Sequence, residues 1–270
     1  MKKIIKNPMS LAGLIIILII GVRAIFAGYL SPFDPNYINI DAILLSPNEF
    51  HWMGTDALGR DVFSRMLHGA QISLLVGIVA VGISTFIGII LGSLAGYYRG
   101  IADTIIMRLV DVMLSIPSFF LILAVIAFLT PSIWNIMIVI GLTSWMGVTR
   151  LVRAEFLSLK ERDFVLAAQT LGASDFRIIL THLLPNSLGP IIVSTVLGVA
   201  SAVLVESGLS FLGLGVQAPT ASWGNILPDG KEYIQFAWWL SLFPGLAILI
   251  TVLGYNLLGE GLRDNFDQNT

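Results

Sequence analysis

Cysteine is absent from the sequence, and charged residues are scarce. The absence of cysteine excludes disulfides and cysteine-ligated metal sites. Charged residues make up 12%, whereas soluble domains average about one quarter. The net charge of −2 offers no basic surface, so we do not expect nucleic acid as a partner. In contrast, 56% of the residues are hydrophobic and the mean hydropathy is +0.88, which indicates a chain that lies in a bilayer.

Motifs of known bond chemistry are also missing. The one Gly-Lys pair, Gly230-Lys231, lacks both the first glycine and the hydroxyl residue of a phosphate-binding loop. There is no H-E-x-x-H pair and no G-x-S-x-G elbow. The histidines are too widely spaced to form a metal site: His51, His68 and His182. We therefore predict that the chain is not an enzyme and holds no metal or cofactor, so uphill transport would need an ion gradient or a partner.

Long apolar stretches predict an all-α, polytopic protein with six spans, since one span needs about 20 mostly apolar residues. The predicted spans are 11–30, 72–98, a third and fourth within 104–152, 178–205 and 233–259. The break at Thr130–Ser132 separates the third span from the fourth. Pro185 is expected to stop a helix before the fifth span. Glycines and prolines predict an irregular outer loop over 207–228, in part re-entrant.

The distribution of basic residues predicts the orientation. With a cytoplasmic N-terminus, eleven basic residues lie inside: Lys2, Lys3, Lys6, Arg99, Arg108, Arg150, Arg153, Lys160, Arg162, Arg177 and Arg263. Only Arg60, Arg65 and Lys231 lie outside, so we expect both termini in the cytoplasm. A cleaved signal peptide is the alternative for the N-terminus, but no small-residue cleavage site closes its apolar run.

Three regions follow from these spans. Residues 1–70 would hold an N-terminal tail, the first span and an outer loop. Residues 71–260 would form the membrane core, with a cytoplasmic loop over 153–185. Residues 261–270 would be a cytoplasmic tail.

Few ionisable residues lie within the predicted spans. Glu206 is near the outer end of the fifth, Asp111 near the inner part of the third, and Arg23 late in the first. Charges at membrane depth pair inside the protein or line a transport path. We interpret Arg23 as structural. Glu206 and Asp111 either have a structural role or lie along the translocation path or gate. Such a small supply argues against an ion-coupled carrier.

The cytoplasmic loop predicts a helix, a turn and a second helix. Residues 163–171 contain good helix formers, and Gly172 permits a left-handed turn. Ser174 is a candidate N-cap for the second helix. Ala167 and Ala168 are small enough to let a partner's groove approach closely. An exposed helix with an unfilled apolar face predicts a protein partner.

The pattern Ala167-Ala168-x-x-x-Gly172, with Leu184-Pro185 after it, resembles the EAA loop of ABC importer permeases. In that family the loop docks into a cleft on the ATPase subunit. The resemblance implies an ATPase-coupling role for these residues: Ala167, Ala168, Gly172, Ser174, Leu184 and Pro185. Leu166 stands where the motif has glutamate, which weakens any polar or capping role of that acid. An ordinary amphipathic pair of interface helices is the alternative.

Other segments resemble the dipeptide/oligopeptide/nickel branch of that family, and within it the second of two paired permeases. They are HWMGTDALGRDVFSR at 51–65, DVMLSIPSF at 111–119, SFLGLGVQAPTASWGN at 210–225 and GYNLLGEGLRD at 254–264. Together they extend the resemblance over nearly the whole chain. The outer segment would contact a binding protein, brace the gate or form a turn network through Gly54, Thr55, Asp56, Gly59, Arg60 and Asp61.

The resemblance implies a type I ABC importer permease in the plasma (inner) membrane of a bacterium or archaeon. Its partners would be a paralogous permease, two ATPase subunits that hold ATP and Mg, an extracytoplasmic solute-binding protein and membrane lipid. Di- and oligopeptides are the favoured solutes, with nickel or a metal chelate as the alternative. An ion-coupled secondary transporter and a membrane scaffold are further alternatives, and the EAA-like loop favours the importer over both.

Overall fold

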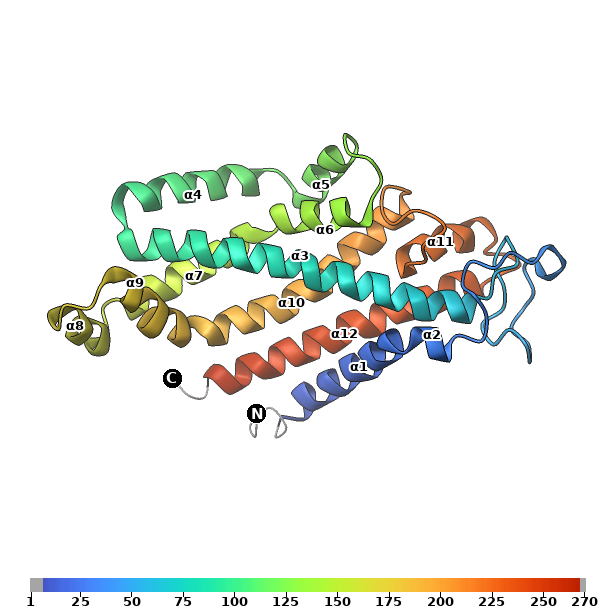
Figure 1. Ribbon diagram of the computed structural model, residues 1–270, viewed down its shortest axis with the longest axis horizontal. Coiled ribbons are helices and arrows are strands. Elements are labelled where there is room, and N and C mark those ends of the chain that lie inside the picture. Colours follow the sequence, from blue (N-terminus) through green and yellow to red (C-terminus); the bar gives the residue numbers. More distant parts are fainter. Residues whose placement is uncertain (1–6, 268–270) are drawn as a thin grey trace.

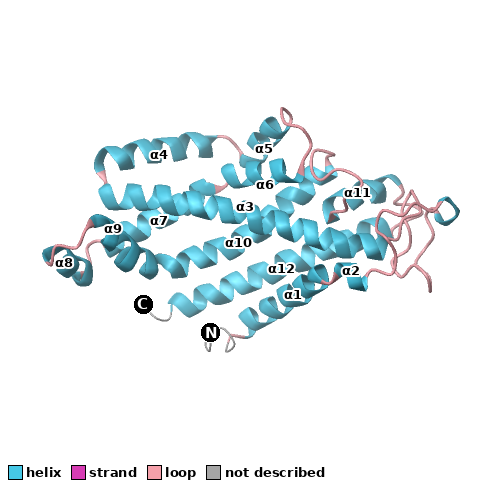
Figure 2. Cartoon of the chain, viewed as in Figure 1, coloured by secondary structure: helices cyan, strands magenta, loops and turns pink. Residues whose placement is uncertain are grey.

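The computed structural model describes residues 7–267, and the regular structure in this range is helical (Figures 1 and 2). Lys2, Lys3, Lys6 and residues 268–270 lie outside the described residues. The longer helices are α1 (Pro8–Ile25), α3 (Val62–Tyr98), α4 (Gly100–Ser115), α6 (Ile133–Leu142), α7 (Trp145–Leu159), α10 (Leu184–Phe211), α11 (Trp223–Glu232) and α12 (Trp239–Asp267). The shorter ones are α2 (Ala27–Leu30), η2 (Ile40–Ala42), α5 (Ser118–Ile126), α8 (Asp163–Thr170), α9 (Asp175–Arg177) and η3 (Ile178–Leu183).

The helices give five spans, and a sixth if the bent pair α4–α5 counts as one. The long helices run roughly parallel, with the loop before α3 at one end and α8 at the other (Figure 1). The start of α1 and the end of α12 lie toward the α8 end (Figure 1). An all-α membrane protein with five or six candidate spans is therefore confirmed.

The second span starts earlier than predicted. α3 begins at Val62 rather than at residue 72, because Asp61 caps it: the Asp61 carboxylate accepts bonds from the Ser64 backbone N–H (2.8 Å) and the Ser64 hydroxyl (2.7 Å). At 1.5 Å per residue, the helix is about 55 Å long and extends beyond the roughly 30 Å hydrocarbon layer. The outer loop thus ends at Asp61, not near Ala70.

The third and fourth spans are interrupted at more places than Thr130–Ser132. α4 and α5 meet at 83°, because Pro117 excludes the helical conformation from Ile116, whose backbone is extended. α6 and α7 are separated at Thr143 and Ser144. There the Thr143 hydroxyl donates to the Val139 carbonyl at 2.7 Å, and the Thr143 backbone N–H donates to the same carbonyl at 3.1 Å.

Pro185 does not stop a helix, contrary to prediction. α9, η3 and α10 form one continuous run from Asp175 to Phe211. η3 is a π-helical segment in which the Leu184 N–H bonds to the Ile179 carbonyl. This wider turn accommodates the missing N–H of Pro185. The Asn186 side chain donates to the His182 carbonyl at 2.6 Å and satisfies a group near the proline.

Two other predicted boundaries also differ. The segment 207–228 is not an irregular loop throughout, because α10 continues to Phe211 and α11 starts at Trp223. α11 begins with a capping box in which Ser222 and Asn225 each bond the other's backbone N–H. At the C-terminal end α12 continues to Asp267, so the predicted tail from residue 261 is helical as far as the structure describes it.

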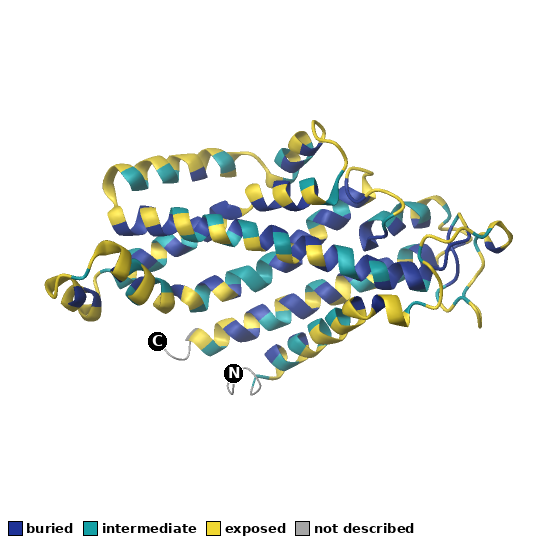
Figure 3. Ribbon diagram, in the orientation of Figure 1, coloured by how far each residue is buried: buried dark blue, intermediate teal, exposed yellow. Residues whose placement is uncertain are grey.

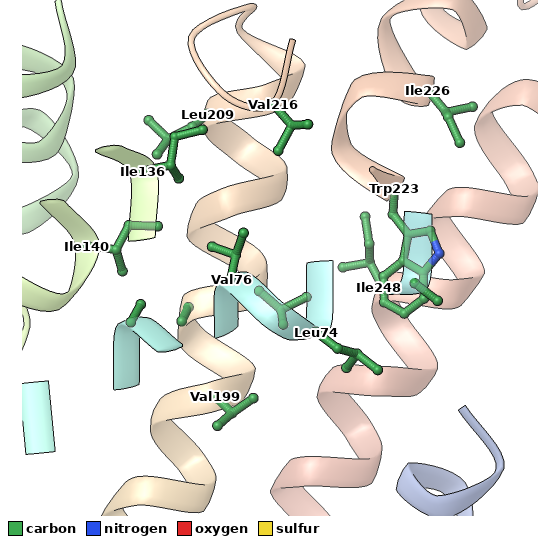
Figure 4. Packing of buried hydrophobic residues seen from close by; sticks show 14 of the residues in the cluster. Leu74, Val76, Ile136, Ile140, Val199, Leu209, Val216, Trp223, Ile226 and Ile248 are labelled. Atoms are coloured by element: carbon green, nitrogen blue, oxygen red, sulfur yellow. The ribbon is translucent and has the colours of Figure 1, made fainter. Parts of the chain in front are cut away.

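The main hydrophobic core lies between α3, α6, α10, α11 and α12. Figure 4 shows Leu74 and Val76 of α3 near Val199 of α10, with Trp223 of α11 beside Ile248 of α12. Helices α1, α4 and α8 carry much of the exposed surface (Figure 3). For α1 and α4 this exposure suits helices that face lipid or another membrane subunit.

Candidate functional site

The helices of the predicted cytoplasmic loop, α8 and α9, protrude beyond the bundle (Figure 1), and much of their ribbon is exposed (Figure 3). Leu171 is 87% exposed and Phe176 is 72% exposed, although both are large hydrophobic residues. Phe164 and Leu166 on α8 are exposed as well. We call these four residues the apolar docking surface. Leu166, at the position of the motif's glutamate, therefore adds apolar area where the motif would place a charge.

Gly172 forms the turn between α8 and α9 as predicted. Its φ of +78° is in the left-handed region, and its N–H bonds to the Gln169 carbonyl. The Ala173 N–H bonds to the Ala168 carbonyl, which completes a Schellman motif. A side chain at Gly172 would meet no other atom within 4 Å, so this position faces open space.

The other predicted coupling residues differ in exposure. Ala167 and Ser174 are exposed, whereas Ala168 is nearly buried against the protein. Ser174 occupies the N-cap position of α9, but its side chain makes no capping hydrogen bond. Leu184 and Pro185 lie within the continuous helix at the start of α10.

The loop is anchored to the ends of α3 and α7. Val165 of α8 packs in a second hydrophobic cluster with Phe156 and Ile178. The Tyr97 hydroxyl donates to the Asp175 carboxylate at 2.7 Å, and Lys160 donates to the Tyr97 carbonyl at 2.6 Å. These contacts connect α8 and α9 to α3, so a displacement of the loop reaches the membrane core directly.

A cavity of about 250 Å³ lies between α3, α5, α6, α7 and α10. Its polar lining consists of hydroxyl side chains: Ser84, Thr85, Ser118, Ser144, Ser194 and Ser201. No charged residue lines it. Sequence reasoning missed this group. The available signal was the seven-residue spacing of Ser194 and Ser201, which places these two on one face of a helix.

Glu206 and Asp111 are not among the residues that line this cavity. Glu206 is fully buried, and its carboxylate accepts bonds from the hydroxyls of Ser210 (2.7 Å) and Ser73 (3.0 Å). Asp111 is exposed on α4 and pairs with Arg150 of α7 at 2.6 Å. The structure therefore gives each acid a partner within the chain, while a path role for either stays a prediction.

The six predicted outer-loop residues come together as a buried network. Asp56 accepts bonds from the backbone N–H of Arg60 (3.0 Å) and its Nε (2.7 Å), and pairs with Arg65 at 3.4 Å. Asp61 contacts His51 at 2.9 Å. The Trp239 indole donates to the Thr55 carbonyl at 3.0 Å and ties the loop to α12.

Both outer-loop glycines have a positive φ, and each packs against backbone. A Cβ on Gly59 would lie 1.8 Å from the Asn39 carbonyl oxygen, and one on Gly54 would lie 2.7 Å from that of Leu45. Asp229 of α11 lies beside the network. Its pKa is raised by burial and by the nearby Asp56 carboxylate, and Arg60 opposes the rise. The geometry thus matches the turn-network interpretation, and contact with a binding protein stays a prediction.

No group of three or more His, Asp or Glu side chains among residues 7–267 could hold a metal ion. The candidate site therefore consists of the uncharged cavity, the buried Glu206 carboxylate, the buried outer-loop network and the protruding apolar docking surface.

Comparisons with known proteins agree with this arrangement. The family model for "Binding-protein-dependent transport system inner membrane component" matches residues 88–270. The model for "N-terminal TM domain of oligopeptide transport permease C" matches residues 1–47. The structure is similar to the MetNI methionine ABC transporter in inward-facing form, with a TM-score of 0.58, 17% identity, and coverage of 75% of this chain and 94% of that one.

Curated relatives match along nearly the whole chain. The probable D,D-dipeptide transport system permease protein DdpC of Escherichia coli (strain K12) is 44% identical, over 97% of this chain and 88% of the relative. The dipeptide transport system permease protein DppC of Bacillus subtilis (strain 168) is 42% identical, over 98% and 83%. The chain therefore belongs to the binding-protein-dependent transport system inner membrane components, and is a multi-pass permease subunit of an ABC importer, distinct from its ATPase.

Proposed function

We propose that this chain forms half of the translocation path for di- and oligopeptides in an ATP-driven importer. The observation that carries the solute class is the neutral, hydroxyl-lined cavity beside α10. Hydroxyls both donate and accept hydrogen bonds, so they suit the N–H and C=O groups that all peptides share, whatever their side-chain charge. The relatives named above are described as dipeptide permeases, which supports the same solute class.

The energy would come from partner subunits. In this proposal a paralogous permease completes the path, two ATPase subunits hold ATP and Mg, and an extracytoplasmic binding protein delivers the solute. The apolar docking surface and the Gly172 turn point away from the helical bundle, on the predicted cytoplasmic side, where an ATPase cleft would receive them. Closure of the ATPases would then shift α8 and α9, and the continuous α9–α10 helix would move with them as a rigid body.

Uptake of a labelled dipeptide and of labelled nickel tests the solute class. The two are compared in cells with and without this chain, in a strain that lacks other peptide and nickel importers. Loss of dipeptide uptake alone is expected. Loss of nickel uptake alone would show that the solute is nickel rather than a peptide. Loss of neither would refute the proposed solute class.

Reconstitution tests the energy source. We expect uptake in liposomes only when the partner subunits and ATP are present. Uptake by this chain alone under an ion gradient would show an ion-coupled carrier instead.

A further inference from the structure

An apolar groove of about 380 Å³ lies between α1, α3 and α12, in the half of the molecule next to the outer loop. Its walls include Ile16, Ile20, Leu67, Phe243, Ala247 and Ile250. Trp223 also borders it, beside the core at Ile248 (Figure 4), and its indole N–H already donates to the Met66 carbonyl at 3.1 Å. The groove therefore offers hydrocarbon contacts along its length.

Arg23 is the one charged side chain among the residues that line this groove. It is exposed on α1, and within residues 7–267 it has no hydrogen-bond or ion-pair partner. The end of α1, two residues later, places Arg23 near carbonyls that favour a cation but carry no full negative charge. An arginine at membrane depth normally pairs or extends to an interface, so we expect the unpaired Arg23 guanidinium to extend to the headgroup level, where lipid phosphates are the nearest anions.

The depth of Arg23 points to the headgroup region of the outer leaflet. Fifteen residues separate it from Pro8, which is about 22 Å along a helix, against a hydrocarbon thickness of about 30 Å. The exposed rings of Phe26 and Tyr29 form a pair with centroids 6.4 Å apart, one to two turns beyond Arg23. Exposed aromatic residues of this kind mark the membrane–water interface. A phosphate at that level would be within reach of a snorkelling arginine.

From this geometry we propose that the groove binds a phospholipid with a net negative headgroup. Arg23 holds the phosphate, and an acyl chain lies along α1 over Phe243 and Ala247. An unpaired cation and an apolar groove lie side by side. An anionic lipid matches both, because its phosphate is negative and its acyl chains are apolar. This role is independent of the transported solute.

Photolabelling of the assembled importer in nanodiscs tests the proposal. The probe is phosphatidylglycerol with a photoreactive acyl chain, and labelled peptides are mapped by mass spectrometry. We expect label on α1, on the first turns of α3 and around Phe243 and Ala247 of α12. Arg23→Gln should reduce this label about fivefold, as expected for loss of one cation near an anionic surface, while Arg23→Lys retains it.

Two further variants separate charge from shape. Arg108→Gln removes another exposed arginine, on α4 and far from the groove, that has no hydrogen-bond or ion-pair partner within residues 7–267, and it should leave the label unchanged. Ala247→Phe narrows the groove with Arg23 intact and should reduce the label. The unfolding temperature of each variant shows that the fold persists.

Three results would overturn the site. One is equal labelling of wild type and Arg23→Gln. Another is equal labelling by a phosphate-free diacylglycerol probe. The third is crosslinking of a photoreactive residue at Ile19 to the partner permease, which would show that protein fills the groove. Equal labelling by phosphatidylethanolamine would overturn the preference for a net negative headgroup.

Discussion

Glu206 is a buried carboxylate surrounded by serines. Ser73 comes from α3 and Ser210 from α10, and the backbone N–H of Trp223 in α11 donates to the Ser73 hydroxyl at 3.3 Å. One acid therefore joins three helices at the outer end of the core. Because this position is fully buried, water cannot replace a lost partner, and the network depends on the acid itself.

Glu206→Ala should destabilise the protein by about 1–3 kcal/mol, because buried hydroxyls lose their acceptor. Glu206→Gln keeps one acceptor oxygen and should cost less. The measurement is the unfolding temperature of the purified chain in detergent. Glu49→Ala, at an exposed outer-loop position, is the control and should change nothing. Equal stability of all three variants would contradict the serine network.

Gly172→Arg should leave the chain in the membrane and abolish transport. The left-handed backbone costs a non-glycine residue about 1–2 kcal/mol, and the new side chain would enter the ATPase-facing space. Uptake and membrane content are measured together. Gly213→Arg is a matched control, since Gly213 also has a positive φ (+76°) and open surroundings but follows the opposite end of α10. Normal uptake by Gly172→Arg would refute the coupling role.

At the scale of elements, glycines bring α3 and α7 into close contact. Gly88, Gly92 and Gly96 lie four residues apart on one face of α3. A Cβ at these positions would approach Val148 at 2.5 Å, the Thr149 carbonyl oxygen at 2.7 Å and Phe156 at 2.7 Å, respectively. Small residues at this spacing let membrane helices pack backbone to backbone. The contact supports the cavity wall and the base of the coupling loop.

Gly92→Leu should separate α3 from α7 and lower the yield of folded protein. Overpacking of this kind costs about 1–3 kcal/mol or more. Size-exclusion profiles and unfolding temperature in detergent measure the effect. Gly82→Leu is the control, because Gly82 lies on the same helix with no atom within 4 Å of its Cβ position. Similar behaviour of the two variants would show that the glycine face is not a packing surface.

Prediction from the sequence succeeded for helices whose position depends on hydrophobicity. It failed for helix boundaries that depend on local hydrogen bonds. The five or six spans followed from apolar length, and the turn at Gly172 followed from glycine chemistry. In contrast, the stop at Pro185 was wrong because a π-helical turn and Asn186 compensate for the proline. The early start of α3 depends on the Asp61 cap, which a hydropathy pattern does not register.

Candidate sites could be predicted only where their residues lie close together in the sequence. The helices and turn of the predicted coupling loop were visible because the small residues and the apolar face are local in sequence, while the ATPase-coupling role stays a prediction. The hydroxyl cavity was not, because its serines and threonine come from helices that only the fold brings together. Glu206 was found as an unusual charge, but its serine partners on α3 and α10 depend on tertiary packing.

At the scale of the whole molecule, two helical runs connect opposite ends. α3 and the α9–α10 run each contain 37 residues, about 55 Å at 1.5 Å per residue. Tyr97 at the end of α3 bonds Asp175 at the start of α9, and Ser73 of α3 bonds Glu206 near the end of α10. The two helices are thus connected near both ends. The loop with α8 and α9 at one end and the outer-loop network at the other are therefore linked through this pair of helices.

The orientation of this helix pair in the membrane can be tested with single introduced cysteines, because the chain has no cysteine of its own that would be labelled. Ser46 is exposed in the outer loop and Ser174 in the cytoplasmic loop. The basic-residue asymmetry predicts that a membrane-impermeant maleimide labels Ser46→Cys in intact spheroplasts and Ser174→Cys only after permeabilisation. The reverse pattern would invert the topology.

The same pair of variants also tests the docking surface. If an ATPase covers α8 and α9, Ser174→Cys should label several-fold more slowly in permeabilised membranes that contain the ATPase subunits than in membranes without them. Ser46→Cys, at the opposite end of the molecule, should label at one rate in both. Equal rates at Ser174→Cys would place the ATPase contact elsewhere, because a thiol between Gly172 and Phe176 could not stay accessible beneath a bound subunit.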